Sequence, residues 1–323
     1  MSVCWPNLPK DVKRIIVEPL CRIDRLNLRQ CSWGDKLFVD LVSKPIREVN
    51  FMASRSYIII RYDEEYEDYF GHSEGNTEVR RSKNLLPFNS FSMSEDFQIV
   101  AWRSLQKMMK SQNNEIDTLN FSFIGRLNFN EEDNEPQIII PNLPEKTLNV
   151  RKLSIFLDSS EEMTKRIVQF AKPGLDSLNV SITVKNVNDP SEMGSLEQLK
   201  TAKKIRSNLM LTLNHSMELE GDEVINKTTL INDEGVVELL KKSLSSGKPS
   251  KFHYNRLWPD IPTIVSSFDS IAWSLETSEQ FDNLGNHFKI DLSKKNFILS
   301  NDNSSLFVEF DKFSARGFIL NKQ

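Results

Sequence analysis

The four histidines are the residues of this chain best suited to acid–base or metal chemistry. They stand at His72, His215, His253 and His287, and none belongs to a His-x-x-x-His or His-Glu-x-x-His pattern. Zinc sites on helices need such close spacing because two ligands must reach one ion from the same face. The histidines therefore predict no metal site, and we expect each of them to be an isolated polar residue.

The cysteines and carboxylates do not supply a reactive centre either. Cys4, Cys21 and Cys31 all lie in the first tenth of the chain, without metal-ligand spacing to a histidine and without a basic constellation that would activate a thiolate. The acidic run at residues 63–68 has no apolar surroundings that would separate the pKa values of two carboxyl groups. We therefore expect a non-catalytic chain with no metal and no cofactor.

Composition narrows the class of protein. With 39% hydrophobic and 27% charged residues over 323 positions, the chain is typical of a globular protein with a sizeable core. A net charge of -4 offers no basic field for phosphates, so nucleic-acid binding is not expected as its main task. No stretch approaches the ~18 apolar residues of a membrane span. Three cysteines do not indicate disulfide stapling, so a cytoplasmic or nuclear protein is expected, with no membrane partner.

The elements that could position a binding site begin at the N-terminus. Pro9 suits the first turn of a helix, and apolar residues then recur at helical spacing up to Leu20. Pro19 threatens the last turn of that helix, and Asp24 offers an N-cap to a second helix that starts near Arg25. Two helices this short bury too little apolar surface to be stable alone. The segment is therefore predicted to dock on a partner surface.

This segment resembles an F-box in spacing and content. The matching elements are Leu8-Pro9, Ile16 to Leu20, Asp24, Leu26 to Leu28 and Cys31-Ser32. The segment departs from the usual pattern at Pro19 and near residue 35, where many F-boxes carry a tryptophan and this chain has Trp33 nearby. The resemblance implies a substrate-receptor subunit of a Skp-cullin-F-box ubiquitin ligase, docked on a Skp-type adaptor and through it on a cullin. The adaptor contacts that it implies are Leu8, Pro9, Val12, Ile16, Leu20, Leu26, Leu28 and Cys31.

An alternative interpretation is that the N-terminal helices cap a larger domain of the same chain and bind no adaptor. The exposure of their apolar side chains separates the two interpretations. Complete burial against residues 45–130 would favour the cap, whereas a partly exposed apolar surface favours docking.

Beyond residue 45, one strand template recurs, with apolar residues at its first, fourth, sixth and eighth positions. Such alternation is typical of a strand that buries one face. The copies begin at Ile116, Val150, Leu175 and Phe268, with weaker ones at Ile46, around Phe252 and at Leu209. Capped helical segments are expected between them, at residues 92–110, 159–172, 232–247, 193–205 and 259–268.

This order predicts a mixed α/β fold in which a short all-α F-box precedes an irregular leucine-rich-repeat-like solenoid. An ordinary α/β domain whose buried strands share a motif is the alternative. In the solenoid, the residues between the buried ones would face a target protein. The residues expected there are Asn120, Ser122, Ser154, Phe156, Asn179, Ser181, Ala272 and Ser274. For Phe156, burial under a neighbouring helix is the competing expectation.

The same region also resembles the FTH domain that follows the F-box in a large nematode family of F-box proteins. The resemblance rests on residues 46–66 and above all on Phe170 to Leu178, where a helix end, a Lys-Pro-Gly turn and a strand start follow one another. It implies a substrate-recruiting domain whose target differs from member to member. The expected organisation is an F-box helical domain at residues 1–44 and an FTH or leucine-rich-repeat-like domain at residues 45–323.

Overall fold

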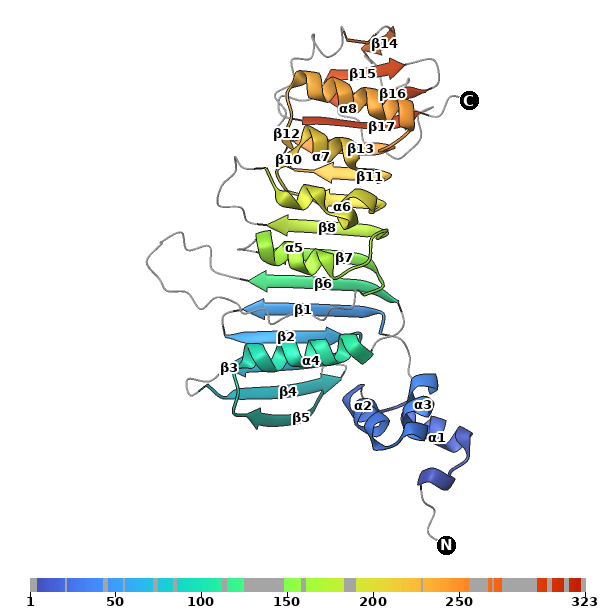
Figure 1. The fold of residues 1–323 in the computed structure, drawn as a ribbon, viewed down its shortest axis with the longest axis vertical. Helices are drawn as coiled ribbons and strands as arrows, with labels where there is room; N and C mark the ends of the chain where they lie inside the picture. Colours follow the sequence, from blue (N-terminus) through green and yellow to red (C-terminus); the bar gives the residue numbers. More distant parts are fainter. Residues whose placement is uncertain are drawn as a thin grey trace. The chain divides into compact units, whose positions relative to one another are not determined.

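Helices open the chain and a long series of strands follows, as the computed structural model in Figure 1 shows. The structure describes residues 5–20, 22–42, 46–54, 56–71, 75–83, 86–111, 115–124, 148–157, 161–182, 190–227, 229–255, 267–268, 270–274, 295–300, 304–310 and 314–320. The chain divides into two compact units. The first comprises Met1–Leu119 and Asn130–Pro144, and the second comprises Asn120–Phe129 and Glu145–Gln323.

Three α-helices follow a short 3-10 turn in the N-terminal segment. The turn η1 spans Trp5–Asn7, and the helices are α1 (Lys10–Val17), α2 (Arg22–Cys31) and α3 (Trp33–Val42). The expectation that Pro19 disturbs the last turn of the first helix agrees with the structure, because α1 ends at Val17 and Pro19 lies in the turn after it. Asp24 is not an N-cap either, since α2 already begins at Arg22. Asp24 lies in the first turn, where a negative charge suits the helix dipole.

The third helix, α3, is missing from the sequence-based expectation. Ser32 supplies its start, because its hydroxyl accepts a hydrogen bond of 3.0 Å from the backbone N–H of Asp35 and donates one of 2.7 Å to the Asp35 carboxylate. A hydroxyl in this position satisfies one of the free N–H groups at a helix start. α3 packs on α2 and also contacts α1. The N-terminal helices therefore form a three-helix arrangement, not two isolated pieces.

An antiparallel sheet forms most of the first unit. Its strands are β1 (Glu48–Ser54), β2 (Tyr57–Tyr62), β3 (Glu65–Gly71), β4 (Thr77–Lys83), β5 (Leu86–Met93) and β6 (Ile116–Ile124), in which the boundary between the units falls. The spatial order is β6-β1-β2-β3-β4-β5, and the four pairs β1–β2, β2–β3, β3–β4 and β4–β5 are antiparallel. The weak strand template at Ile46 is thus a real strand, and it pairs antiparallel with β2 at the start of a meander.

The helix α4 (Phe97–Ser111) packs against β2, β3 and β4. Its Trp102 is fully buried, with the ring centroid 4.5 Å from that of Phe51. The predicted start at Ser92 is wrong, because Ser92 pairs with Glu78 across the β4–β5 ladder. Asp96 caps the helix in its place, since its carboxylate accepts a hydrogen bond of 2.8 Å from the N–H of Gln98.

Strands and helices alternate through the middle of the second unit. The strands of its main sheet are β7 (Val150–Leu157), β8 (Ser177–Ile182), β9 (Lys204–Ser207), β11 (Glu223–Asn226) and β13 (Lys251–Asn255). They are neighbours in this order, and each adjacent pair is parallel. The template at Leu209 was assigned to the wrong residues: β9 precedes it, and Leu211–Thr212 (β10) pairs instead with Thr229–Leu230 (β12) in a separate small sheet.

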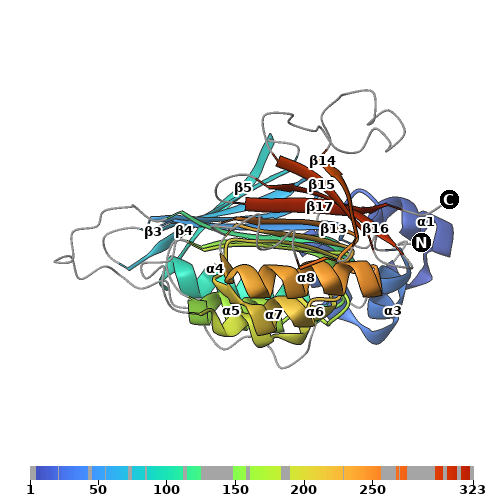
Figure 2. The same ribbon diagram turned by 90° about the horizontal axis from the view of Figure 1, so that it is seen from above.

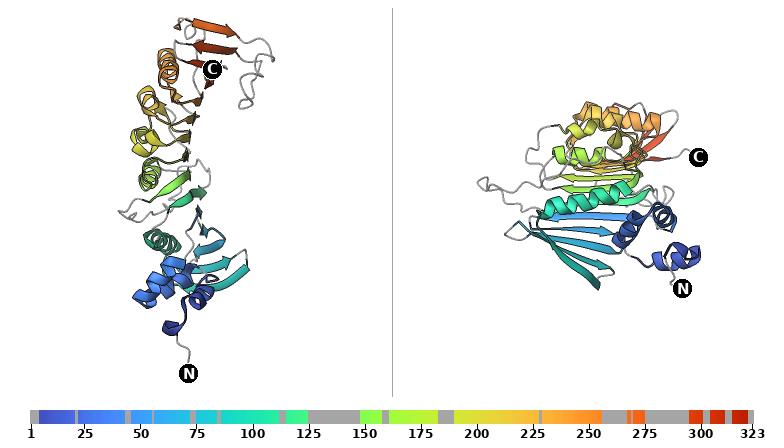
Figure 3. Two further views of the ribbon diagram at one scale, coloured as in Figure 1. Left: turned by 90° about the vertical axis from the view of Figure 1, so that its right-hand side faces the viewer. Right: turned by 60° about the horizontal axis from the view of Figure 1, so that its bottom comes forward.

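Helices cover one face of these parallel strands (Figures 2 and 3). They are α5 (Glu161–Gln169), α6 (Glu197–Thr201), which follows the 3-10 turn η2 (Glu192–Ser195), α7 (Leu213–Glu218) and α8 (Asp233–Ser246). The predicted ends of α8 are confirmed. The side chain of Asn232 accepts a hydrogen bond of 3.0 Å from the N–H of Gly235, and Gly247 closes the helix with a left-handed φ of 70° that glycine tolerates.

The C-terminal strands continue the sheet beyond β13 in antiparallel pairs. They are β14 (Ser270–Ser274), β15 (Lys295–Ser300), β16 (Ser305–Phe310) and β17 (Ser314–Leu320), in the order β13-β17-β16-β15-β14. Each adjacent pair runs antiparallel. A parallel, repeat-like array is thus present in residues 150–255, whereas the pairs from β1–β2 to β4–β5 and from β13–β17 to β15–β14 are antiparallel. The prediction of successive parallel strands is wrong for residues 46–93 and for the template at Phe268. The candidate helix at 259–268 lies almost wholly outside the described residues.

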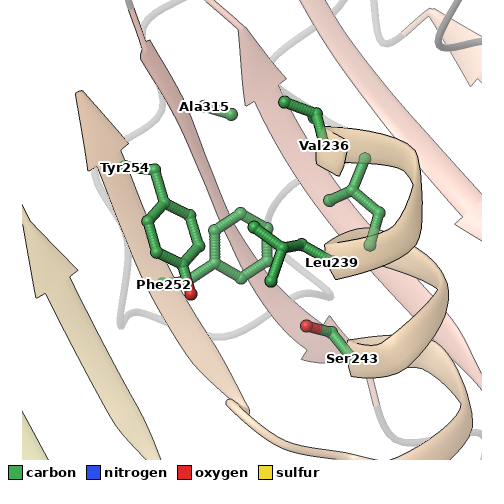
Figure 4. A pocket seen from close by; sticks show the side chains of 7 residues that line it. Val236, Leu239, Ser243, Phe252, Tyr254 and Ala315 are labelled. Atoms are coloured by element: carbon green, nitrogen blue, oxygen red, sulfur yellow. The ribbon is translucent and has the colours of Figure 1, made fainter. Parts of the chain in front are cut away.

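A small cavity lies between α8 and the strands β13 and β17 (Figure 4). Its volume is about 10 Å³, room for one water molecule at most. It is lined by Val236, Leu239, Leu240, Ser243, Phe252, Tyr254 and Ala315. The hydroxyl of Tyr254 is buried without a hydrogen-bond partner, and burial raises the pKa of that hydroxyl. The cavity is too small for an organic ligand, so it is a packing feature of the core.

Candidate docking surfaces

Several large apolar side chains of α1 and α3 are exposed. On α1, Val12 is 40% exposed, Ile15 70% and Ile16 41%, while Val17 is fully buried and serves as the core residue of this helix. On α3, Trp33 is 70% exposed and Leu37 49%. We call Val12, Ile15, Ile16, Trp33 and Leu37 the N-terminal apolar surface. Exposed apolar groups gathered on one short segment are typical of a site that another protein covers.

Polar contacts fix the helices that carry this surface. The indole N–H of Trp5 donates a hydrogen bond of 2.5 Å to Asp35, and the ammonium of Lys13 lies 5.4 Å from the centroid of the same ring. Arg25 on α2 reaches the end of α1, where its guanidinium donates to the carbonyl oxygens of Val17 at 3.2 Å and Glu18 at 2.6 Å. Carbonyls at a helix end have no partner inside the helix, so this arginine satisfies them and joins α2 to α1.

The structure places most of the expected adaptor contacts at the surface. Pro9, Val12, Ile16 and Cys31 are exposed, and Leu8, Leu20 and Leu28 are half-buried. The side chain of Leu26 lies outside the described residues. None of the seven described contacts is fully buried, which is the outcome that the docking interpretation requires. The sequence-based list omitted Ile15, Trp33 and Leu37; the spacing of Trp33 and Leu37, one helical turn apart, is the signal that could have found the last two.

The comparison with known families bears on this segment. Residues 5–47 match the model of the F-box domain. The chain carries an F-box. F-box proteins are generally substrate adaptors and not enzymes, and F-box domains typically bind Skp-type adaptors. The F-box is consistent with a substrate-receptor role in a Skp-cullin-F-box ubiquitin ligase. No curated protein and no solved structure matches the chain.

A second candidate surface follows the parallel strands of the second unit, on the face that the helices α5 to α8 leave uncovered. Along β7 to β13, buried and more exposed residues alternate, and buried Phe252 and Tyr254 point toward α8. Their neighbours must point to the opposite face, since successive side chains of a strand alternate. We call this face the open sheet face. It consists of Lys152, Ser154, Phe156, Ser177, Asn179, Ser181, Lys204, Arg206, Glu223, Ile225, Lys251 and His253.

None of the expected target-binding residues whose side chains are described is buried: Phe156 is exposed and the others are half-buried. Ser154 pairs with Asn179 and Phe156 with Ser181 across the β7–β8 ladder, so the four side chains form two neighbouring rows. Phe156 is 46% exposed, so its predicted alternative, burial under a helix, is wrong. Asn120 and Ser122 on β6 are half-buried and alternate with the buried Phe121. The side chains of Ala272 and Ser274 lie outside the described residues.

The sequence analysis missed the basic residues of the open sheet face. Three of its four basic side chains surround one carboxylate: Glu223 lies 4.0 Å from the ammonium of Lys204, 3.8 Å from the guanidinium of Arg206 and 3.7 Å from the ammonium of Lys251. Lys152 stands on β7, opposite Ser177. The signal was present in the sequence as basic residues at alternate positions of β9 and β13, but only the strand register brings them together.

One short segment of the chain matches the sequence motif of a hydrolase nucleophile elbow. Residues 71–75 read Gly-x-Ser-x-Gly. They join β3 to β4, which pair antiparallel, whereas a nucleophile elbow needs a sharp turn from a strand into a helix. Two antiparallel strands on either side of these residues do not provide that strand-to-helix context. Over the residues described, three or more metal-ligating side chains never gather into a possible metal site. No helix in that part of the chain is long and apolar enough to cross a membrane.

Proposed function

We propose that this chain is the substrate-receptor subunit of a Skp-cullin-F-box ubiquitin ligase. The F-box helices, residues 1–44, dock on a Skp-type adaptor and through it on a cullin. Residues 45–323 then recruit a target protein, in the manner of an FTH or leucine-rich-repeat-like domain. The chain itself performs no chemistry, and it acts in the cytoplasm or the nucleus.

The exposure of the N-terminal apolar surface carries this proposal. Burying one such side chain contributes roughly 1.5–3 kcal/mol, and a few apolar anchors usually supply most of the binding free energy of an interface. Val12, Ile15 and Ile16 fall within one turn of α1, so one partner surface can cover them together. Apolar side chains with this exposure are accessible to a partner such as the adaptor.

The open sheet face supports target recruitment. Its strands are held rigidly by the ladder from β7 to β13, so a protein bound there keeps a fixed orientation. A receptor that holds a target lysine near a charged ubiquitin-conjugating enzyme accelerates transfer by proximity alone. This receptor therefore needs a rigid surface and an adaptor contact, and no catalytic residue of its own.

Co-purification with a Skp-type adaptor tests the proposal. The double variant Leu8→Ala/Pro9→Ala removes two adaptor contacts, and Lys10→Ala/Asp11→Ala alters the two exposed residues that follow as a matched control. We expect the adaptor to be recovered with the wild type and the control and to be lost with Leu8→Ala/Pro9→Ala, while circular dichroism shows the same helix content in all three. Equal recovery of the adaptor from all three proteins would refute adaptor docking through the F-box.

A further inference from the structure

The open sheet face has a charge opposite to that of the chain as a whole. The chain carries a net charge of -4, whereas the face presents four basic side chains and the single carboxylate of Glu223. Lys204 and Arg206 are each 63% exposed and Lys251 42%. Charges at such exposure are accessible from the solvent, and like-signed charges on one face raise the local concentration of an oppositely charged segment.

We propose that the open sheet face binds an extended, carboxylate-rich segment of the target protein. This inference rests on the proposed function, because it specifies the class of target that the receptor recruits. Glu223 shows that the cations of this face can surround a carboxylate. Its carboxylate lies 3.7–4.0 Å from three cations, which is too far for a direct hydrogen bond to any of them. Lys204 and Arg206, each 63% exposed, therefore present donors that the carboxylates of a partner can reach.

The strand register sets the length of the segment. Ser154 pairs with Asn179, Asn179 with Arg206, Arg206 with Ile225, and Ile225 with His253. This row crosses five strands, and neighbouring strands lie about 4.8 Å apart, so it spans about 19 Å. An extended peptide advances about 3.4 Å per residue, so about six residues of a target cover the row.

The spacing of the cations favours carboxylates over a phosphate group. A phosphate is recognised by several donors that converge on one point, most often from arginines. Here Lys152, Lys204 and Lys251 stand on three different strands, and Arg206 is the one arginine that belongs to the open sheet face as defined above. Cations spread over the face in this way match single charges distributed along a chain. Phe156 at its edge offers a contact for an apolar side chain of the same segment.

Fluorescence anisotropy with the full chain tests this inference. The probe is a fluorescein-labelled peptide Gly-Ser-Glu-Glu-Phe-Glu-Glu-Ser-Gly, compared with the same peptide carrying Gln for every Glu and with a nine-nucleotide oligothymidine. The variant Lys204→Gln/Arg206→Gln removes two cations from the face. The matched control Arg166→Gln/Lys241→Gln removes two exposed cations from α5 and α8, which lie on the other face.

We expect the Glu peptide to bind at least about tenfold more tightly than the Gln peptide, and its affinity to fall as added salt shortens the screening length. Lys204→Gln/Arg206→Gln should weaken it at least about fivefold and the control less than about twofold. No preference for Glu, equal loss in both variants, or tighter binding of oligothymidine would overturn the inference. Adaptor binding is measured on the same preparations; if it is intact while the peptide fails to bind, the inference fails and the receptor function stands.

Discussion

Trp5 and Asp35 are joined by a hydrogen bond of 2.5 Å from the indole N–H to the carboxylate, across thirty residues of sequence. The bond ties η1 to the first turn of α3. It also lowers the pKa of Asp35 below its usual range, together with the hydrogen bond from Ser32 and the nearby charge of Lys13. The tryptophan that holds the F-box helices together thus precedes α1, while Trp33 on α3 is left exposed.

Trp5→Phe should loosen α3 without unfolding the chain. Phenylalanine keeps the aromatic ring but cannot donate to Asp35. A hydrogen bond of this kind at a partly exposed site contributes about 1 kcal/mol, so we expect roughly fivefold faster amide hydrogen exchange in α3. The strands of the second unit serve as the internal control and should exchange as in the wild type. Unchanged exchange in α3 would show that the Trp5–Asp35 bond does not stabilise the helix.

The same bond makes a prediction about pH. Because the pKa of Asp35 is lower in the folded chain than in the unfolded one, its stabilising effect is complete above the unfolded pKa of about 4 and is lost as pH falls through the folded value. In a titration of the Asp35 carboxyl carbon by NMR, we expect a midpoint below 4 in the wild type and a higher midpoint in Trp5→Phe. If Asp35 had the same midpoint in the wild type and in Trp5→Phe, the indole N–H would not be the main cause of the lowered pKa.

The register of β7 is tested by two neighbouring residues. Ile155 is fully buried and Phe156 is 46% exposed, so Ile155→Asp places an unpaired charge in the core while Phe156→Asp places one in water. We expect the first substitution to cost more than about 4 kcal/mol of unfolding free energy and the second less than about 1 kcal/mol. Thermal unfolding followed by circular dichroism makes the comparison. Similar melting temperatures for the two variants would contradict the strand register.

A buried carboxylate stabilises the first unit. Glu67 accepts hydrogen bonds from Tyr69 at 2.8 Å and Ser104 at 2.7 Å, and it lies 3.4 Å from the guanidinium of Arg81. Burial, followed by the charge of Glu67, raises the pKa of Tyr69 well above its usual value.

Because Glu67→Ala leaves the largely buried Arg81 without this carboxylate, we expect a loss of about 3–5 kcal/mol in chemical denaturation. The exposed pair of Glu78 and Arg80, at 2.8 Å in the same sheet, provides the contrast. Glu78→Ala should cost less than about 1 kcal/mol. An equally small effect at Glu67 would argue against a structural role for its network.

Local signals were enough to predict some elements of this fold. Asn232 and Gly247 delimit α8 because a side-chain cap and a left-handed glycine act within one turn of the helix. The apolar alternation of β7 and β8 was read in the correct register because one face of each strand is fully buried.

Elsewhere, pairing between strands overrides the preference of the local sequence. Ser92 and Glu95 have the spacing of a capping box, yet the ladder with β4 holds Ser92 in β5 and the helix starts at Phe97. β9 reads Lys-Ile-Arg-Ser, with one apolar residue, so its burial between β8 and β11 could not be seen in the sequence. The basic open sheet face depends on three such registers and was missed for that reason.

The affinity of the full chain for a purified Skp-type adaptor, measured by calorimetry, tests the central claim most directly. Val12→Asp/Ile16→Asp puts two charges on the N-terminal apolar surface and leaves the core residue Val17 in place. Lys10→Asp, at an exposed position of the same helix, is the control. We expect the double variant to weaken binding at least about 100-fold and the control less than about threefold. Equal affinities for all three proteins, or no binding by the wild type, would contradict docking through this surface.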